Sequence, residues 1–473
     1  MKLKGVMTLK LTDINTHEEE TYVDENMVTD AVNDILGSNP MGIFYKAEAN
    51  NTSDMTNWKD TLLPIVKNMI GGIILFPSVL TESESTAYAP SANHPTGYAN
   101  SEVNTTLDTA RGSMNLGESV EIPGGFRFVW EFTPSQGNGL IAAAALTSKQ
   151  GGIAAHGSSV DAASPYLLLK YIRLNQNLSS ELLTEIRSHI IELDFEHGLV
   201  YCLHYASGTI KITKYQVPTF DIGLMDSLNG TSYRLLDTQV ITPSGFAPTT
   251  SNGTTELYID GGDGYWYGFT NGAGNSSGNA SVKWIKIKKE DYTFTEGTWT
   301  LSNVQLKRLG YNNYSGTSYS ECSAVIRGGY LYAMSYDRTS VYKINLTNSA
   351  DVTCITLGIT ANNEGVAKNG GYYNNTHMIL VVDRVVGRGW QLDTSDNVIL
   401  TKDEGCITYA PVSSQFRYKE FLISYGVDSS HFYLQCHLYT PFLATVNNLA
   451  GGTVNKTAEK MMKITYELTE QTT

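Results

Sequence analysis

The sequence predicts a mainly all-β protein, with an N-terminal β-sandwich-like attachment domain carrying one or two short helices, followed by a β-propeller. Three observations lead to this fold class. Aromatic hairpins recur along the later part of the chain, Gly and Tyr are abundant in Asn/Ser/Thr-rich surroundings, and charged residues make up only 17% of the sequence. Helical cytoplasmic enzymes differ from this pattern, because their exposed helix faces usually carry Lys and Glu.

The clearest hairpin spans Gly328–Leu346, in which apolar residues alternate along Tyr330–Met334 and a turn follows at Asp337–Ser340. Equivalent hairpins begin at Gly198 and Gly264, and Gly198, Gly264 and Gly329 lie 66 and 65 residues apart. The spacing between the later copies shrinks to the roughly 40–50 residues usual for one propeller blade. These copies comprise Met378–Asp383 with Gly389–Leu392, and Phe421–Tyr425 with His431–Leu438.

One hairpin is marginally stable because a sheet face and two edges stay open. Such units become stable when their sheets pack around an axis. Five copies therefore predict five blades, and a sixth follows if Tyr166–Ile172 closes a ring with Met461–Leu468. The corresponding division is a docking domain at 1–150, a Gly/Ser linker at 151–165 and a propeller at 166–473.

The first domain begins with a predicted hairpin over Thr8–Val23. Apolar residues at helical spacing then predict a short helix over Met27–Leu36, which Gly37 ends. In Leu62–Leu80, two prolines, a lysine and a glycine pair interrupt the apolar run that a membrane span needs. We therefore expect a short helix there, then a break and a buried strand at Ile73–Phe76.

Residues 81–118 are rich in Thr, Ser, Ala, Asn and Gly and have no pattern of their own. A stretch of this length is usually functional or packed against a partner, so it is a candidate contact arm. Order returns at Gly124–Phe132, which alternates aromatic and polar residues, and a turn then leads to a strand at Leu140–Leu146. Within the propeller region, Ser179–Arg187 predicts one or two helical turns.

The formal net charge is −14, and no run of Lys or Arg occurs. Nucleic acid and anionic membranes are therefore disfavoured as partners, because both are bound chiefly through positive charge. A carbohydrate or a protein partner stays open. The first residues, Met1–Leu11, alternate like a strand and lack the apolar block of a signal peptide, so secretion by the general pathway is not expected.

Motifs for nucleophilic or metal chemistry are weak. Gly274–Gly278 matches the G-x-S-x-G pattern of serine hydrolases, but it lies in a Gly/Asn loop rather than at a strand-to-helix turn. Cys202 and His204 share one strand face without a third ligand at a recognisable spacing. Asp260–Gly264 and Asp393–Asn397 are short acidic turns that lack the EF-hand pattern. We predict no metal and no cofactor.

A carbohydrate site is the remaining possibility for chemistry on a propeller. Glycosidases of this fold place two carboxylates across the central channel. Aromatic side chains in Gly/Asn-rich surroundings can also stack on a sugar, although core packing explains a tryptophan equally well. The carboxylate candidates are Asp194, Asp260, Asp383 and Glu404, and the ligand-binding candidates are Trp390, Tyr311 and Tyr314. No catalytic residue is assigned.

Several stretches, in order along nearly the whole chain, resemble a family of tail-associated structural and adhesion proteins from tailed phages and prophages of Gram-positive bacteria. The resemblance is carried by their joint order rather than by any single motif. The stretches are Leu9–Thr16, Asn26–Ala31, Ile70–Phe76, Arg111–Ser119, Trp130–Gly139, Leu146–Thr147, Leu443–Leu449, Val454–Ala458 and Met462–Leu468.

The resemblance implies a virion structural protein, that is, a tail, baseplate or fibre component. Its first domain would dock to the virion, and its propeller would contact virion proteins or a glycan or protein of the host surface. Such a part would be made in the host cytoplasm and would form a symmetric homo-oligomer, with a trimer favoured. The alternative is a propeller-fold glycosidase that cleaves wall or capsular polysaccharide.

Overall fold

The fold is mainly β, as the sequence predicts. In the computed structural model of the chain, the described residues contain strands β1 to β36 and one helix, α1 (Asp30–Gly37). No helix among the described residues is long and apolar enough to cross a membrane. The structure describes residues 3–37, 70–151, 156, 166–175, 190–194, 197–216, 234–248, 257–272, 274–309, 311–314, 317–320, 324–361, 367–368, 378–401, 406–407, 414–427 and 431–470.

The first unit is a single curved sheet whose strands follow the order β4-β3-β9-β34-β2-β1-β36-β7-β5, with β6 added beside β7. Its strands are β1 (Leu3–Asp13), β2 (Glu19–Val28), β3 (Ile70–Phe76), β4 (Gly97–Ala99), β5 (Ser113–Met114), β6 (Val120–Ile122), β7 (Gly125–Phe132), β9 (Ala143–Ser148), β34 (Thr445–Asn448) and β36 (Lys460–Glu470). A separate pair joins β8 (Gly139–Ile141) to β35 (Val454–Lys456).

The two ends of this sheet nearly meet, which makes it barrel-like. At the β4 end, the Tyr98 carbonyl accepts from the Gly112 N–H at 2.8 Å, and the Tyr98 N–H donates to Ala110 at 2.9 Å. Tyr98 thereby forms a parallel bridge with Arg111, immediately before β5. The predicted β-sandwich-like domain thus takes the form of one nearly closed sheet, which we call the barrel.

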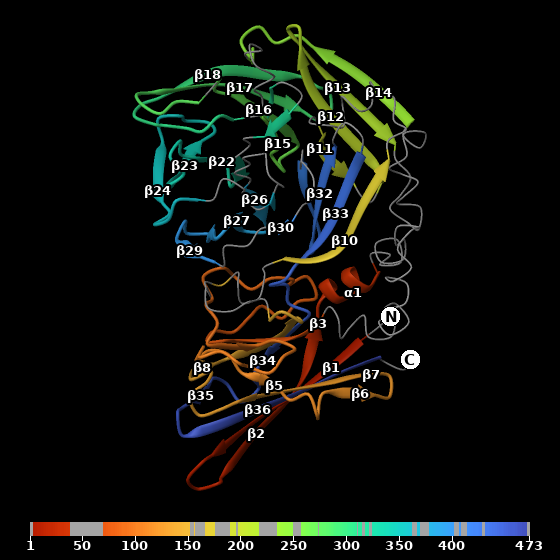
Figure 1. Cartoon of the computed structure of the whole chain (residues 1–473), viewed down its shortest axis with the longest axis vertical. Helices are drawn as coiled ribbons and strands as arrows, with labels where there is room; N and C mark the ends of the chain where they lie inside the picture. The colour runs from red at the N-terminus through yellow and green to blue at the C-terminus, as the bar shows by residue number, and fades with distance from the viewer. Residues whose placement is uncertain are drawn as a thin grey trace.

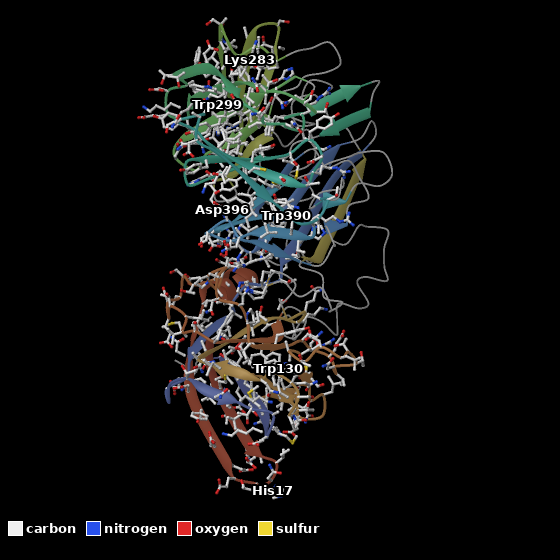
Figure 2. The ribbon with its side chains drawn as sticks, turned by 90° about the vertical axis from the view of Figure 1, so that its left-hand side faces the viewer. His17, Trp130, Lys283, Trp299, Trp390 and Asp396 are labelled. Atoms are coloured by element: carbon white, nitrogen blue, oxygen red, sulfur yellow. The ribbon has the colours of Figure 1, made fainter. Side chains whose placement is uncertain are left out.

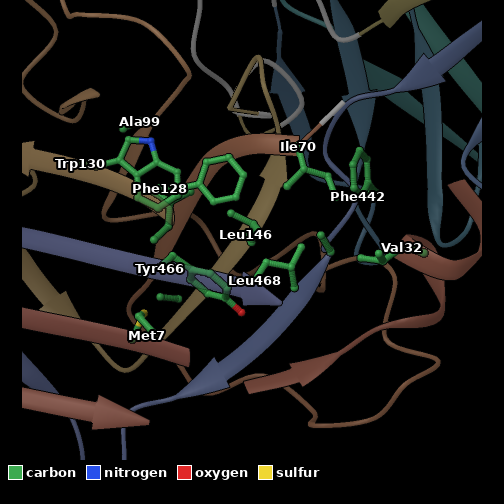
Figure 3. Close-up of a cluster of buried hydrophobic side chains, with 14 of the residues drawn as sticks. Met7, Val32, Ile70, Ala99, Phe128, Trp130, Leu146, Phe442, Tyr466 and Leu468 are labelled. Atoms are coloured by element: carbon green, nitrogen blue, oxygen red, sulfur yellow. The ribbon is translucent and has the colours of Figure 1, made fainter. Parts of the chain in front are cut away.

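Alternating side chains fill the barrel. In β36, Met462, Ile464, Tyr466 and Leu468 are each at most 2% exposed, while the residues between them face outward. They pack against alternate residues of β1 and β7, its two neighbours in the sheet. Helix α1 adds its apolar face to the same cluster, part of which Figure 3 shows. The helix predicted over Met27–Leu36 is therefore present, with a later start.

Five four-stranded antiparallel sheets form the second unit, and we number them blades 1 to 5, each from its innermost strand outward. Blade 1 has β11 (Ile190–Asp194), β12 (Leu199–Ala206), β13 (Thr209–Gln216) and β14 (Arg234–Ile241); blade 2 has β15 (Leu257–Asp260), β16 (Tyr265–Thr270), β17 (Ala280–Lys288) and β18 (Phe294–Leu301); blade 3 has β21 (Ala324–Arg327), β22 (Tyr330–Met334), β23 (Ser340–Asn345) and β24 (Val352–Thr356).

Blades 4 and 5 complete the set. Blade 4 has β26 (Ile379–Val381), β27 (Arg384–Gly387), β28 (Trp390–Leu392) and β29 (Val398–Leu400); blade 5 has β31 (Ser414–Tyr418), β32 (Phe421–Val427), β33 (His431–Tyr439) and β10 (Tyr166–Asn175). Two short pairs lie outside the blades: β19 (Tyr311–Tyr314) with β20 (Thr317–Ser320), and β25 (Ala367–Lys368) with β30 (Cys406–Ile407).

The innermost strands contact one another in a closed circle, in the order β11, β15, β21, β26, β31 and back to β11. In Figure 1, the inner strands β11, β15 and β26 lie near the centre of the ring, and β14, β18, β24 and β29 lie at its rim. Strand β10 comes first in the chain but is the outermost strand of blade 5, paired with β33. The described sheets therefore form a five-bladed propeller closed by its two chain ends.

The pairing of β10 corrects one alternative from the sequence. Tyr166–Ile172 closes the ring against His431–Tyr439, not against Met461–Leu468, so no sixth blade forms from these segments. The segment Met461–Leu468 lies instead between β1 and β7. Its alternation suits any half-buried strand, so its period alone does not distinguish a blade from a barrel.

The propeller is therefore inserted into the barrel. The chain leaves the barrel after β9, builds the blades, and returns through β34, β35 and β36. The predicted propeller boundary of 166–473 is too long at its end, because Thr445–Glu470 belongs to the barrel. The helix expected before Ile70, the helical turns at Ser179–Arg187 and most of the linker at 151–165 lie outside the described residues.

Close packing inside blade 4 gives a stability prediction. A Cβ atom added to Gly387 would lie 2.2 Å from the buried Trp390 ring. Gly387→Ala should therefore lower the free energy of unfolding by about 1–3 kcal/mol, the usual effect of overpacking. Urea denaturation followed by circular dichroism measures this change. Gly117→Ala is the control, because its Cβ would meet only the Asn115 side chain, at 3.6 Å; equal effects at both sites would contradict the prediction.

Candidate functional site

The predicted sugar-stacking residues do not form an exposed aromatic site. Trp390 lies in β28 and is 1% exposed, packed in the core between blades 3 and 4. Its ring therefore cannot stack on a ligand from solvent, which corrects its assignment as a ligand-binding candidate. Tyr311 and Tyr314 lie in β19, outside the blades, and their side chains are outside the described residues.

The predicted carboxylates lie at or just after the ends of innermost strands, where each described one has a bonded partner. Asp194 accepts a 2.7 Å contact from His197 Nδ1, and Asp260 accepts from the Lys289 ammonium at 2.9 Å. Asp383 accepts from the Ser91 hydroxyl at 3.4 Å. Glu404 lies outside the described residues.

The two acidic turns take part in contacts between blades. Lys289 of blade 2 binds Asp260 and also Glu192 of blade 1, at 2.7 Å. In the second turn, Asp396 of blade 4 forms an ion pair with Arg327 of blade 3 and accepts from Lys343 at 2.6 Å. Cations of the chain itself thus occupy carboxylates that the sequence offered as metal ligands. Figure 2 shows Asp396 beside Trp390 in the part of the propeller nearest the barrel.

The remaining motifs have structural roles in the described residues. Gly274–Gly278 lies between β16 and β17, as predicted, with Gly274 at φ 76° against the backbone of Leu306. Cys202 is 1% exposed within the core cluster. No group of three or more His, Cys, Asp or Glu side chains that could hold a metal ion occurs among the described residues.

A different cluster of titratable groups lies where the barrel meets blades 4 and 5. The propeller supplies Arg384, Glu420 and Tyr439, which are 1%, 3% and 1% exposed. The barrel supplies Asp34 of α1 and Tyr88 of the 81–118 segment. Buried ionisable groups gathered at a domain boundary mark a functional candidate, because such sites favour displaced pKa values and ligand binding. We call this cluster the junction.

Arg384 links the barrel segment to blade 4. Its guanidinium donates to the Ala89 carbonyl at 2.6 Å, and its Nε lies 3.7 Å from the Asp383 carboxylate. Next to this pair, the Ser91 hydroxyl donates to Asp383 and accepts from the Thr394 N–H at 3.2 Å. The barrel segment is therefore fixed to the β26–β27 turn by charged and polar contacts.

Aromatic rings and a second ion pair complete the junction. The Tyr88 and Tyr439 ring centroids are 6.0 Å apart, and the Arg417 guanidinium lies 5.4 Å from the Tyr88 centroid. Burial raises the pKa of both phenols, and neighbouring arginines oppose the rise. Lys419 pairs with Asp34 of α1. The contacts thus run from α1 and the 81–118 segment to two blades.

Glu420 is the most perturbed carboxyl of the junction. Burial, and next the Asp34 carboxylate, raise its pKa to about 7. Its Oε2 has no hydrogen-bond partner in the described part of the chain. A carboxyl with this pKa can carry a proton at neutral pH and serve as an acid. At 3% exposure, however, Glu420 does not reach a substrate in this conformation. The arrangement favours a structural junction that responds to pH.

Sequence reasoning missed the junction because its members are far apart in the chain: Ala89 and Arg384 are separated by 295 positions. The one sequence signal was the 81–118 segment, predicted as a contact arm because it lacks a pattern of its own. In the structure, part of this segment contacts the chain's own propeller, through Tyr88, Ala89 and Ser91.

No family model and no curated protein matches the chain. Solved structures show distant likeness. Apo AztD from Citrobacter koseri is 10% identical, with 86% of this chain and 96% of that chain covered and a TM-score of 0.25. A GH43 glycoside hydrolase is 8% identical over 63% and 58%, with a TM-score of 0.24. The WD40 domain of SCAP from fission yeast is 11% identical over 51% and 57%, with a TM-score of 0.21. Likeness at this level carries no argument about function.

Proposed function

We propose that this chain is a virion structural protein of a tailed phage, whose barrel docks to other virion proteins and whose propeller is held out for contact with the host surface. One observation carries the proposal. The propeller is inserted into the barrel, and the core of the barrel continues into blades 1 and 5 through residues such as Cys202, Phe421 and Leu438. Two chain crossings and a shared core fix the orientation of a presented module better than a flexible linker does.

A loop of the barrel supplies a docking feature. Leu107 is 99% exposed at the tip of a loop held by its own hydrogen bonds. Asn104 accepts from the Thr106 N–H at 2.8 Å and donates to the Arg111 carbonyl at 2.9 Å, and Asp108 accepts from the Tyr98 hydroxyl at 2.9 Å. Val103 of the same segment is 50% exposed, and exposed apolar patches mark protein contacts. The loop lies within the predicted contact arm.

The charge around Leu107 indicates the chemistry of its partner. Glu102, in the same segment as Leu107, exposes 76% of its side chain, whereas its neighbour Arg111 is 4% exposed. We propose that the loop enters an apolar socket with a basic rim on another virion protein. A homo-oligomer, with a trimer favoured, remains part of the proposal, because tail components surround an axis.

Replacing Leu107 by aspartate should reduce incorporation into particles by about tenfold, equivalent to ~1.4 kcal/mol of lost association free energy. Phage lacking its own copy is complemented with the full chain, and quantitative mass spectrometry of purified particles measures incorporation. Leu235→Asp is the matched control, since Leu235 is 53% exposed on the outermost strand of blade 1. Absence of the wild-type chain from particles would contradict the proposed function. Normal incorporation of the Leu107 variant would contradict the docking loop.

A propeller-fold glycosidase is the second candidate, and Glu420 is the observation that favours it. A carboxyl with a pKa of about 7 near the Asp34 carboxylate has the acidity of a general acid, and because Glu420 is 3% exposed, this candidate requires the junction to open around a substrate. If the wild-type chain releases reducing sugar from cell-wall glycans and the Glu420→Gln variant does not, the glycosidase role replaces the structural role. If the wild-type chain releases no sugar, the glycosidase reading is rejected.

A further inference from the structure

Blade 2 departs from the blade repeat at one position. In blades 1, 2 and 3, a tyrosine of the second strand lies directly opposite a lysine of the third strand, and the ammonium lies over the ring at 5.5, 5.0 and 6.0 Å from its centroid. The pairs are Tyr201 with Lys214, Tyr267 with Lys286, and Tyr332 with Lys343. These pairs give a common register for comparing the blades.

The side chain two residues before this lysine differs between blades. In blades 1 and 3 it is a buried aliphatic residue, Ile212 at 2% and Val341 at 0% exposure. In blade 2 it is Trp284, which is only partly buried. Trp284 therefore packs against the blade core and also keeps an aromatic surface in contact with solvent, where the other two blades place a buried aliphatic residue.

The residue that faces this position from the fourth strand also differs in blade 2. Gln239 faces Ile212, and Ile355 faces Val341, but Gly297 faces Trp284. A Cβ atom at Gly297 would lie 2.9 Å from the Trp284 ring, so the missing side chain leaves room for the indole across β18. The buried Trp299 supports the indole at 6.1 Å between ring centroids. Blade 2 thus holds a partly exposed indole in a fixed position.

Polar groups suited to hydroxyl recognition share this face of blade 2. The Lys286 ammonium, two residues along from Trp284, lies 3.9 Å from the Tyr265 ring centroid and 3.6 Å from the Asp263 carboxylate. Asp263 also accepts from the Tyr267 hydroxyl at 2.7 Å. Partly exposed aromatics, Trp284 and Tyr265, beside a carboxylate and an ammonium combine an apolar platform with donors and acceptors, as saccharide sites require.

The place of blade 2 in the molecule favours an external ligand. Figure 1 shows β17 and β18 at the end of the propeller farthest from the barrel. In Figure 2, turned by 90°, Trp299 and Lys283 of the same blade again lie at the end opposite His17, the tip of the barrel. A module docked through its barrel would therefore present blade 2 outermost.

We propose that Trp284 is a stacking platform for a pyranose ring and that the chain binds a polysaccharide at this surface of blade 2. The C–H face of the sugar packs on the indole, and its hydroxyls bond Asp263 and Lys286. The inference deepens the proposed function by naming the class of host-surface ligand, and it rests on the propeller being the presented module.

Cosedimentation of the full-length chain with purified Gram-positive cell-wall sacculi tests this inference. Trp284→Ala removes the indole, and Gly297→Val displaces it. Each variant should weaken binding by about tenfold, equivalent to ~1.4 kcal/mol. Trp284→Phe should retain part of the binding, which excludes simple loss of folding. Tyr336→Ala is the matched control, because Tyr336 is 47% exposed outside this surface. Acid extraction removes wall polysaccharide from the sacculi. Binding that survives extraction identifies peptidoglycan as the source of the sugar, and binding that is lost identifies wall polysaccharide.

Two results would overturn the inference: no sedimentation of the wild-type chain with either preparation, or equal binding by Trp284→Ala and wild type. Neither depends on particle incorporation. A chain that enters particles but does not bind sacculi rejects the saccharide site and leaves the virion role intact. A chain that binds sacculi but is absent from particles rejects the virion role and supports the saccharide site.

Discussion

Replacing Arg384 by methionine is expected to lower the free energy of unfolding by about 3–5 kcal/mol, the usual loss when one member of a buried charged contact is removed. Arg384 is 1% exposed, so the Ala89 carbonyl loses a buried charged partner, while the Asp383 carboxylate, 27% exposed, is only partly rehydrated. Methionine keeps the length and apolar stem of the side chain, which limits the effect of a cavity. The loss should fall on the contact between barrel and propeller.

Urea denaturation followed by tryptophan fluorescence and by circular dichroism measures this effect. If the junction couples the two units, the variant should unfold in two steps, with transitions that no longer coincide between probes. Lys10→Met is the control, because its ion pair with Glu19 lies on the surface, with 38% and 50% of the two side chains exposed. Such pairs contribute about 0–1 kcal/mol. A similar small loss in both variants would show that Arg384 does not hold the junction.

The propeller was predictable from sequence because its information is local. Each hairpin carries its own strands and turn, as in Tyr330–Met334 and Asp337–Ser340, and the glycine spacing repeats them. The insertion was not predictable in this way. Met461–Leu468 alternates as a blade strand would, and its partners β1 and β7 are set by pairing across the whole chain. Periodicity fixes which side of a strand is buried, not which sheet it joins.

The two tryptophans show why the sequence favoured Trp390, which is buried, over Trp284 as a ligand-binding candidate. Trp390 and Trp284 each pack against a glycine, Gly387 and Gly297. Trp390 faces the core shared by blades 3 and 4 and is buried, whereas Trp284 lies at the margin of its cluster and keeps solvent contact. The glycines beside Trp390 are visible in the sequence, whereas Gly297 faces Trp284 only through strand pairing. Whether they make room for burial or for a ligand depends on the strand pairing, which aligns Trp284 with its equivalents in other blades.

The last prediction concerns the proton on Glu420, whose pKa burial and the Asp34 carboxylate raise from an ordinary value near 4.5 to about 7. Because the folded chain binds this proton more tightly than the unfolded chain, the stability it contributes is complete below about pH 4.5 and is lost as the pH rises through 7. The full loss corresponds to about 3 kcal/mol, from 1.36 kcal/mol per pKa unit. Glu420→Gln, which mimics the protonated form, should therefore be more stable than wild type at pH 8 by up to this amount.

The same comparison at pH 5 should give a difference below about 1 kcal/mol, because Glu420 is then protonated in the folded wild-type chain and ionised only in part of the unfolded chain. Urea denaturation of both proteins at pH 5, 6, 7 and 8 isolates the Glu420 contribution, since other titrating groups are common to both. Glu102→Gln is the control, because Glu102 is 76% exposed and lies in the barrel. A difference for Glu420→Gln that does not change with pH would mean that this carboxyl is solvated. A difference that grows with pH would mean that loss of this one buried proton weakens the folded chain above neutral pH.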